Sequence, residues 1–356
     1  MHSLPPALSS LPPFSTTLIG SFPHRGAADI CRRIIKAVDV PIWPQLPRRD
    51  FREGIYVQYA ASLPRVVLDE EGEKITLDTT GDLTPDLETF YERYLAEDLE
   101  YFALPPDFAA GFHALLPLLG EFPGEWVKGH VVGPLTFGLT VVDQDRRAVF
   151  YHDLLADVIV KNMAMNARWQ VRTLKQYRPN VILFVDEPYL GSWGSAYVSI
   201  DREQAIAALD EIFTAIHAER GIAGVHCCAN TDWSILLRTR VDILNLDAYG
   251  FLESLTLYPV ELRQFLDRGG VIAWGIVPND DAVDRSAPQE VAQQLRAGFA
   301  RISERAAARG VTINPGEFEN RSLLTPACGL GSTTVAIAEK VLSFLPEVSK
   351  ELRNNV

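Results

Sequence analysis

A histidine and two cysteines have the types and spacing of a metal site. His226 and Cys228 are separated by one residue in GVHCCA, and Cys328 lies in TPACGLG. One imidazole and two thiolates suit Zn²⁺, and three protein ligands leave a fourth position open, as in catalytic zinc sites. The alternative is a buried histidine beside cysteines that act as small apolar residues. That alternative does not explain why the third cysteine also falls at the end of a predicted strand.

Zinc held by such a set would suit one kind of chemistry. A free thiol has a pKa of about 8.5 and is mostly protonated at neutral pH. Coordination to Zn²⁺ deprotonates it without a separate base. Two anionic cysteinates should make the ion a weak Lewis acid towards water while leaving a bound thiolate nucleophilic. The set therefore favours alkyl transfer to sulfur over hydrolysis.

Eight apolar runs predict the strands that would position these side chains. Most are bounded by Gly, Pro or Asn, and several are apolar throughout, as parallel strands buried on both faces are. Helical periodicity fills most intervals, notably 148–177, 202–220, 259–268 and 288–309. This alternation predicts an α/β fold, a (β/α)₈ TIM barrel formed by a single domain over 1–356, with a doubly wound open sheet as the alternative. The predicted strands are 17–22, 40–46, 127–135, 181–187, 224–229, 242–248, 271–277 and 323–329.

The interval after the second predicted strand is too long for one helix. Residues 47–126 contain RVVLDEEGEKITLD, in which an apolar run, a charged turn and an alternating run predict a β-hairpin. Stretches rich in aromatic and acidic residues follow and predict helices. We interpret 47–126 as an insertion on the barrel and as a candidate lid over its mouth.

Strand geometry separates the two adjacent cysteines. Successive side chains of a strand point to opposite faces, so His226 and Cys228 share one face and Cys227 lies on the other. The pair is at the carboxyl end of its strand, where barrel active sites lie, and Cys328 ends the eighth strand. The fourth zinc ligand is either Asp247, at the end of the sixth strand, or an exchangeable substrate atom.

Other polar residues also fall at predicted strand ends. The fourth strand ends in Asp186 and Glu187, of which only one can point inward; the other reading of either is a surface carboxylate that caps a helix. Facing inward, Asp186 would bind a substrate cation such as an α-ammonium group. Ser21, at the end of the first strand, could donate to a carboxylate, or it could belong to an ordinary turn.

Composition excludes several classes of function. Acidic residues outnumber basic ones 46 to 33, with no basic cluster that could follow a phosphate backbone, so we expect no nucleic-acid partner. No run approaches the roughly 20 apolar residues that span a bilayer, and the N-terminus lacks the pattern of a secretory signal. Four cysteines in 356 residues are no disulfide scaffold. We expect a cytoplasmic protein without a membrane partner.

Taken in order, these motifs resemble the catalytic barrel of cobalamin-independent methionine synthase. That family's superfamily also contains uroporphyrinogen decarboxylase and the zinc-dependent methylcobamide:thiol methyltransferases. The resemblance runs from about 17 to 330 and implies a (β/α)₈ barrel, zinc bound by His226, Cys228, Asp247 and Cys328, and homocysteine held by Ile19, Ser21 and Asp186. It makes Asp186 the candidate catalytic residue as well. The motifs are LIGSFP at 18–23, GPLT at 133–136, VDEP at 185–188, H-x-C at 226–228 and PACGL at 326–330.

The sequence also departs from that family. Full-length members have two barrels, whereas this chain has the length of one, and Asp247 stands where they usually have Glu. The acidic residue expected after the second strand has no clear counterpart beyond Glu53, and Val277 or a neighbour stands where a histidine is expected. FGLTVVDQ lacks the tryptophan expected to stack on the pterin. The acceptor site is therefore kept and the folate site altered, which favours a corrinoid protein as methyl donor.

Four functions follow from this sequence. The first is methylation of homocysteine to methionine, with methylcobalamin, a methylcorrinoid protein or 5-methyltetrahydrofolate as donor. The second is alkylation of another small thiol by a related zinc enzyme, and Asp186 favours an amino-acid thiol over a sulfonate. The third is a decarboxylase of the uroporphyrinogen type, which needs no zinc. The fourth is a corrinoid- or metal-binding protein without catalysis.

Overall fold

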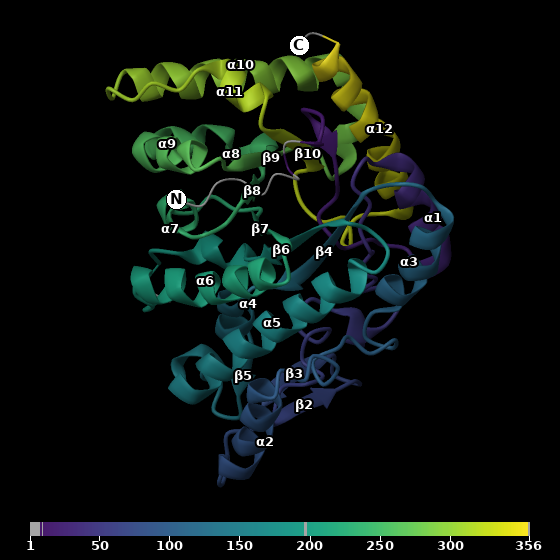
Figure 1. The fold of residues 1–356 in the computed structure, drawn as a ribbon, viewed down its shortest axis with the longest axis vertical. Helices are drawn as coiled ribbons and strands as arrows, with labels where there is room; N and C mark the ends of the chain where they lie inside the picture. Colours follow the sequence, from purple (N-terminus) through teal and green to yellow (C-terminus); the bar gives the residue numbers. More distant parts are fainter. Residues whose placement is uncertain (1–7, 9, 196–197, 355–356) are drawn as a thin grey trace.

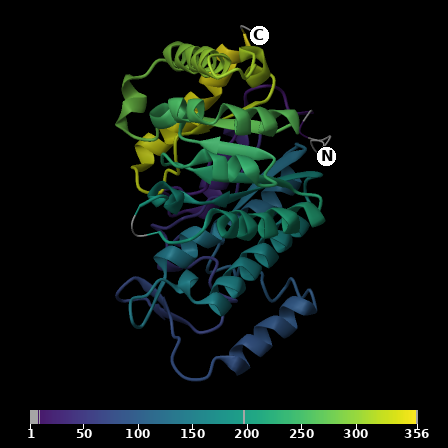
Figure 2. The same cartoon turned by 90° about the vertical axis from the view of Figure 1, so that its left-hand side faces the viewer.

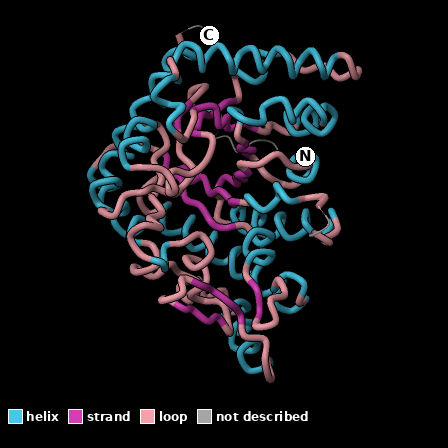
Figure 3. Tube along the Cα trace, turned by 180° about the vertical axis from the view of Figure 1, so that it is seen from behind, coloured by secondary structure: helices cyan, strands magenta, loops and turns pink. Residues whose placement is uncertain are grey.

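A parallel β-sheet surrounded by helices organises the computed structural model, which describes residues 8, 10–195 and 198–354 (Figures 1 and 3). The sheet curves as a half-barrel, with strands in the order β1-β10-β9-β8-β7-β6-β4. Apart from β1, neighbours follow the order of the chain, so the sheet lacks the reversal of a doubly wound fold. The strands are β1 (Ser15–Thr16), β4 (Trp126–Val132), β6 (Asn180–Asp186), β7 (Ile222–Cys227), β8 (Ile243–Leu246), β9 (Val271–Val277) and β10 (Ser322–Pro326).

The first two predicted strands differ most from the structure. The first, 17–22, does not form a regular strand, and the short β1 lies just before it. Segment 40–46 joins its neighbours through the single parallel pairs Ser21 with Gln45 and Ile42 with Lys128. Pro41 and Pro44 interrupt this segment, and proline has no N–H to donate to a ladder. The chain therefore runs between β1 and β4 without becoming a regular strand.

Helices pack against the outer face of the sheet (Figures 1 and 2). Those predicted from periodicity are present with slightly shorter bounds, and 148–177 begins with a 3₁₀ turn before α5. No described helix is long and apolar enough to cross a membrane. The helices along this face are α1 (Ala27–Ala37), α4 (Pro134–Thr140), α5 (Asp153–Leu174), α6 (Arg202–Ala218), α7 (Trp233–Arg238), α8 (Ala248–Phe251), α9 (Pro259–Asp267), α10 (Pro288–Ala307), α11 (Pro315–Glu319) and α12 (Val335–Arg353).

The inner face of the sheet changes from apolar to polar along the strands. A buried cluster near the amino ends includes Ile182, Phe184, Ile222, Ile243 and Ala273. Side chains two residues further along a strand share its face. The polar residues that follow at this spacing are Asp186 after Phe184, Asn245 after Ile243, and Thr325 after Leu323. An apolar floor thus supports a polar layer at the carboxyl ends of the strands.

The hairpin and the helix after it, residues 66–95, lie below the sheet in Figure 1, whereas 110–121 pack beside α1. Strands β2 (Val66–Asp69) and β3 (Lys74–Leu77) pair antiparallel, and β3 also pairs parallel with β5 (Val142–Asp143). Helices α2 (Thr84–Leu95) and α3 (Ala110–Glu121) follow the hairpin. The small sheet therefore attaches the hairpin to the segment that follows α4.

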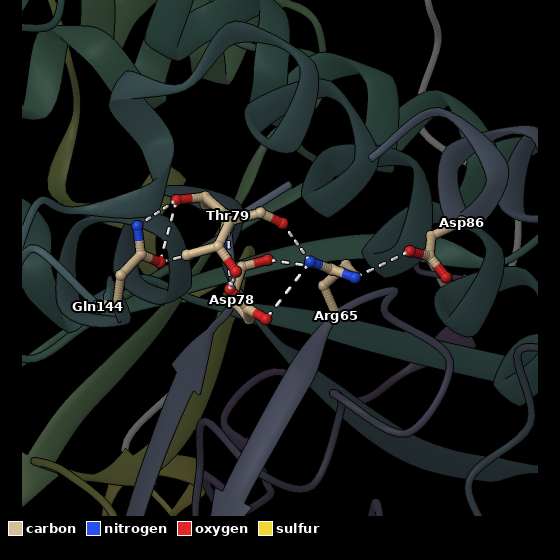
Figure 4. A network of polar contacts seen from close by, with 6 residues as sticks. Arg65, Asp78, Thr79, Asp86 and Gln144 are labelled. Carbon is tan, nitrogen blue, oxygen red and sulfur yellow. Dashed lines mark hydrogen bonds and ion pairs between the residues drawn. The ribbon is translucent and has the colours of Figure 1, made fainter. Parts of the chain in front are cut away.

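One arginine connects the hairpin to the helix that follows it (Figure 4). Arg65 forms ion pairs with Asp78 at 3.3 Å and with Asp86, in α2, at 3.4 Å, and donates to the carbonyl oxygens of Asp78 and Thr80. Beside it, the side chain of Gln144 accepts from the N–H of Thr79 at 3.0 Å. These contacts hold the hairpin against the start of α2 and the loop after β5.

Candidate metal centre

Three side chains from two strand ends converge at the carboxyl edge of the sheet. His226 belongs to β7, Cys228 follows β7 directly, and Cys328 follows β10 by two residues. Their ligand atoms all lie within 4.8 Å of one another, and His226 Nε2 is 3.9 Å from Cys328 Sγ. Tetrahedral zinc with ordinary Zn–S and Zn–N bonds places ligand atoms roughly 3.5–3.8 Å apart. The donor types and separations therefore fit zinc after small movements.

The neighbouring Cys227 is directed away from this group. It is fully buried in the large core cluster between the sheet and the helices, and burial raises its pKa to about 12. Cys228 and Cys328 are only partly buried. The alternation of β7 thus separates one packing cysteine from one accessible cysteine.

The two accessible thiols share a proton beside His226. A hydrogen bond from Cys328, opposed by burial, lowers the pKa of Cys228 to about 4. The same bond, together with burial, raises the pKa of Cys328 far above its ordinary value. Burial lowers the pKa of His226, but the Cys228 thiolate and Asp186 raise it overall. One thiolate is therefore available to a cation at neutral pH.

A cavity of about 270 Å³ opens beside the thiols. Ile19, Ser21 and Asp186, the substrate contacts predicted from the sequence, all line it. So do Pro47 and Ile55, near the start of the 47–126 segment, whereas the hairpin does not, which places the hairpin outside the cavity wall. The lining residues are Ile19, Ser21, Gln45, Pro47, Ile55, Asp186, Pro188, His226, Cys228, Cys328, Gly329, Gly331 and Ser332.

The adjacent carboxylates Asp186 and Glu187 have different roles. Asp186 lines the cavity, and its Oδ1 is buried with no hydrogen-bond partner among the described residues. Burial raises its pKa to about 6. Glu187 accepts from the N–H groups of Leu135 and Thr136 and from the Thr136 hydroxyl, at 2.6–3.0 Å. It caps α4, so Asp186 is the inward carboxylate of the pair.

Asp247 lies next to the thiols but outside the converging group. It caps α8, and its Oδ1 accepts from the N–H of Gly250 at 2.7 Å. Burial raises its pKa, and the charge of Cys228 contributes in the same direction. The structure thus brings together three of the four predicted ligands and leaves Asp247 as a helix cap beside them.

Glu53 does not face the cavity. It is fully buried, and its carboxylate accepts from the N–H of Leu46 at 3.2 Å and from Arg49 at 2.7 Å. These partners hold the turn that follows segment 40–46. Glu53 therefore has structural partners and is not among the residues that line the cavity.

Sequence reasoning missed two buried polar residues below the cavity. Asn245 Oδ1 lies 2.5 Å from His226 Nδ1. Lys128 is fully buried in β4; its Nζ donates to the carbonyl oxygen of Ile19 at 2.6 Å and lies 4.1 Å from the centre of the Phe184 ring. Burial lowers its pKa to about 7. A lysine and an asparagine inside otherwise apolar strands were the signal that could have found both.

Comparison with known proteins supports the fold but does not establish a family. No family model matches this sequence, and no curated protein matches it. Among solved structures the chain is similar to a B12-independent methionine synthase from Shewanella sp. W3-18-1 in complex with selenomethionine. The TM-score is 0.56 at 15% identity, and the match covers 96% of this chain and 98% of that chain. The two proteins therefore share an α/β architecture over nearly their whole lengths.

Proposed function

We propose that this protein is a zinc-dependent methyltransferase that methylates homocysteine to methionine. The observation that carries the proposal is the convergence of His226, Cys228 and Cys328 beside an unpaired carboxylate, Asp186, in one cavity. Zinc bound there would lower the pKa of a substrate thiol and hold it as a nucleophilic thiolate. His226, Cys228 and Cys328 are the proposed ligands, and Asp247 is the protein side chain proposed for the fourth position when substrate is absent.

The cavity residues would then orient an amino-acid thiol. Asp186 would accept the α-ammonium group, because its buried Oδ1 has no partner among the residues that the structure describes and an approaching cation would supply one. The Ser21 hydroxyl and the chain at Ile19 would contact the carboxylate end. The solved neighbour is a methionine synthase in complex with selenomethionine, which supports an amino acid of this size as ligand.

The methyl donor is proposed on sequence grounds. The absence of the expected pterin-stacking tryptophan from FGLTVVDQ favours methylcobalamin or a methylcorrinoid protein over 5-methyltetrahydrofolate. A related zinc alkyltransferase acting on another small thiol is the second candidate, since the ligand set alone does not specify the substrate. A decarboxylase without zinc would leave the convergence of two thiols and an imidazole unexplained.

We also propose that the sheet closes into a full (β/α)₈ barrel in one domain. Segment 40–46 would be the second strand, since it pairs with both neighbours, through Gln45 and through Ile42. Residues 47–126 would then be the insertion after that strand. Closure would bring the ends of the first and eighth strands together, in keeping with the 3.2 Å hydrogen bond from the Gly331 N–H to Ser21 Oγ.

Metal analysis of the purified full-length protein tests the zinc site. We expect close to one zinc per chain, and a loss of nearly all of it in Cys328→Ser. Cys31→Ser is the control, because Cys31 is buried at α1 and its thiol contacts the Gly111 carbonyl oxygen at 3.5 Å, away from the cavity. Zinc retained in full by Cys328→Ser would contradict the ligand set.

A methionine assay tests the reaction. We expect methionine from homocysteine with methylcobalamin or a methylcorrinoid protein, and less from methyltetrahydrofolate. Thiols without an amino group should react poorly. Zinc binding without methionine formation from any of these donors would favour the second candidate.

A further inference from the structure

His226 can bind a metal through Nε2 only when that nitrogen carries no proton. A neutral imidazole has one protonated nitrogen and one acceptor nitrogen, and the partner of the second nitrogen decides which is which. Nε2 faces the thiol of Cys328 at 3.9 Å, and Nδ1 faces the side chain of Asn245 at 2.5 Å. The identity of the Asn245 atom in that contact therefore decides the tautomer.

The other contacts of Asn245 fix its orientation. Its Nδ2 lies 2.7 Å from the carbonyl oxygen of Ala273 and 2.9 Å from the hydroxyl of Thr325. A backbone carbonyl only accepts, so the amide nitrogen must face Ala273. The amide oxygen then faces His226 and requires a proton on Nδ1. A flipped amide would place two acceptors against each other in a site where Asn245 and Thr325 are both fully buried.

This chain of contacts crosses four adjacent strands. His226 pairs in register with Asn245, and Asn245 with Ala273. Thr325 lies in β10, three residues before Cys328. Asn245 thus connects the strand that carries His226 and Cys228 to the strand that leads to Cys328.

We propose that Asn245 is a positioning residue that holds His226 in the Nδ1–H tautomer and leaves Nε2 free for a metal ion. The metal part of this inference rests on the proposed zinc site, whereas the tautomer is a property of the metal-free protein. Partners of this kind typically change metal affinity by 10–100-fold when removed. An amide does so without adding charge to a set that already contains two cysteines.

Two measurements on the full-length protein test the inference. The first is long-range ¹⁵N–¹H correlation of the histidine rings in the metal-free protein, recorded at a pH high enough for the ring of His226 to be neutral. The second is titration with Co²⁺, followed by its visible absorption. We expect the Nδ1–H tautomer in the wild type. In Asn245→Ala we expect a shift towards Nε2–H and a Co²⁺ affinity roughly 10–100-fold weaker.

Asn166→Ala is the matched control. Asn166 is also a buried asparagine that donates to a backbone carbonyl, that of Phe102, but it lies in α5. The Asn166→Ala substitution should lower stability by a comparable amount and change neither the His226 tautomer nor the Co²⁺ affinity. Asn245→Asp, which keeps an acceptor against Nδ1 but no longer donates to the Ala273 carbonyl oxygen, should retain the wild-type tautomer with lower stability.

Failure of this inference and failure of the proposed zinc site would give different results. The Nε2–H tautomer in the metal-free wild type would overturn the inference, and this reading needs no variant to fold. Co²⁺ affinity within twofold of the wild type in Asn245→Ala would also overturn it. A wild-type protein that keeps the Nδ1–H tautomer but binds neither Co²⁺ nor Zn²⁺ would instead overturn the proposed zinc site.

Discussion

Single residues at the cavity are distinguished by the side of the strand on which they emerge. His226 and Cys228 share one face of β7 and reach the cavity, while Cys227 packs into the core. At the end of β6, Asp186 faces the cavity, and Glu187, the next residue, caps α4. Alternation along a strand therefore assigns different chemistry to adjacent residues of the same type.

The two adjacent cysteines allow a direct test of this assignment. Cys228→Ser should reduce bound zinc from about one per chain to near zero, because it removes a thiolate ligand. Cys227→Ser should keep the zinc, although it places a hydroxyl in an apolar site and should cost about 1–3 kcal/mol of stability. Zinc content of the two purified proteins is the measurement. Equal losses in both variants would argue against the strand assignment.

Asp186 gives a second test at the residue scale. Asp186→Asn should raise the KM for homocysteine about 10–100-fold, since a hydrogen bond between charged groups contributes roughly 1.5–3 kcal/mol. Steady-state kinetics should be compared with those for a thiol of similar size that lacks the amino group. For that thiol the wild type and the variant should differ little. A similar loss with both thiols would mean that Asp186 does not bind the ammonium group.

At the scale of elements, sequence patterns predicted the regular segments better than the irregular ones. Strands β4, β6, β7, β8 and β9, and helices α6, α9 and α10, lie where apolar runs and helical spacing place them. Segment 40–46, whose apolar residues suggested a strand, forms only single pairs with its neighbours, because its prolines lack the N–H groups that a ladder needs. Local patterns report which side chains are buried, but pairing depends on the backbone donors.

The same limit applies to the site. Spacing along β7 and β10 located His226, Cys228 and Cys328, because strand ends are visible in the sequence. It did not locate Asn245, whose role arises from contacts with β7, β9 and β10. Nor did it show that Glu187 reaches back to α4, about 50 residues earlier in the chain. Contacts between distant segments are set by the three-dimensional packing, which no local pattern contains.

Loss of the Arg65 contacts should destabilise the hairpin without affecting the metal centre (Figure 4). Arg65→Ala removes two ion pairs and two bonds to carbonyl oxygens, so the hairpin should open more easily. We expect amide exchange in 66–77 to be roughly 10-fold faster, consistent with about 1–2 kcal/mol. Zinc content should not change.

Arg285→Ala is the control for that experiment. Arg285 forms a single ion pair with Asp281, one helical turn away, and both side chains are about 70% exposed. Such a pair contributes little, so exchange should be unaffected throughout the chain. Unchanged exchange in 66–77 of Arg65→Ala would show that the small sheet alone holds the hairpin.

At the scale of the whole molecule, a buried lysine links folding to pH. The pKa of Lys128 falls from 10.5 to about 7 in the folded chain, because burial disfavours the charged form. Between these values the unfolded chain binds more protons, so this group makes stability rise with pH. Asp186 lies nearby and, once ionised, offsets part of the cost of the lysine charge.

Lys128→Met should remove this dependence. Relative to the variant, the wild type should gain on the order of 2–4 kcal/mol between pH 7 and pH 9.5. Loss of the bond to the Ile19 carbonyl gives the variant a constant deficit, so the slope and not the offset is the readout. Urea unfolding across this pH range measures it. Parallel curves for the two proteins would show that Lys128 is not charged differently in the folded and unfolded states.

The proposed zinc ligands also connect parts of the chain that are 100 residues apart, so metal binding should stabilise the whole fold. A ligand that binds only the folded state stabilises it by RT ln(1 + [L]/Kd), about 4 kcal/mol at 1,000 times the Kd. Chelation should therefore lower the Tm of the wild type by about 5–10 °C. Cys328→Ser should have the lower Tm even without chelator, and chelator should not change it further. Cys31→Ser should respond to chelator like the wild type. Calorimetry with and without chelator separates these cases: a chelator effect of equal size in Cys328→Ser would place the stabilising metal elsewhere in the molecule.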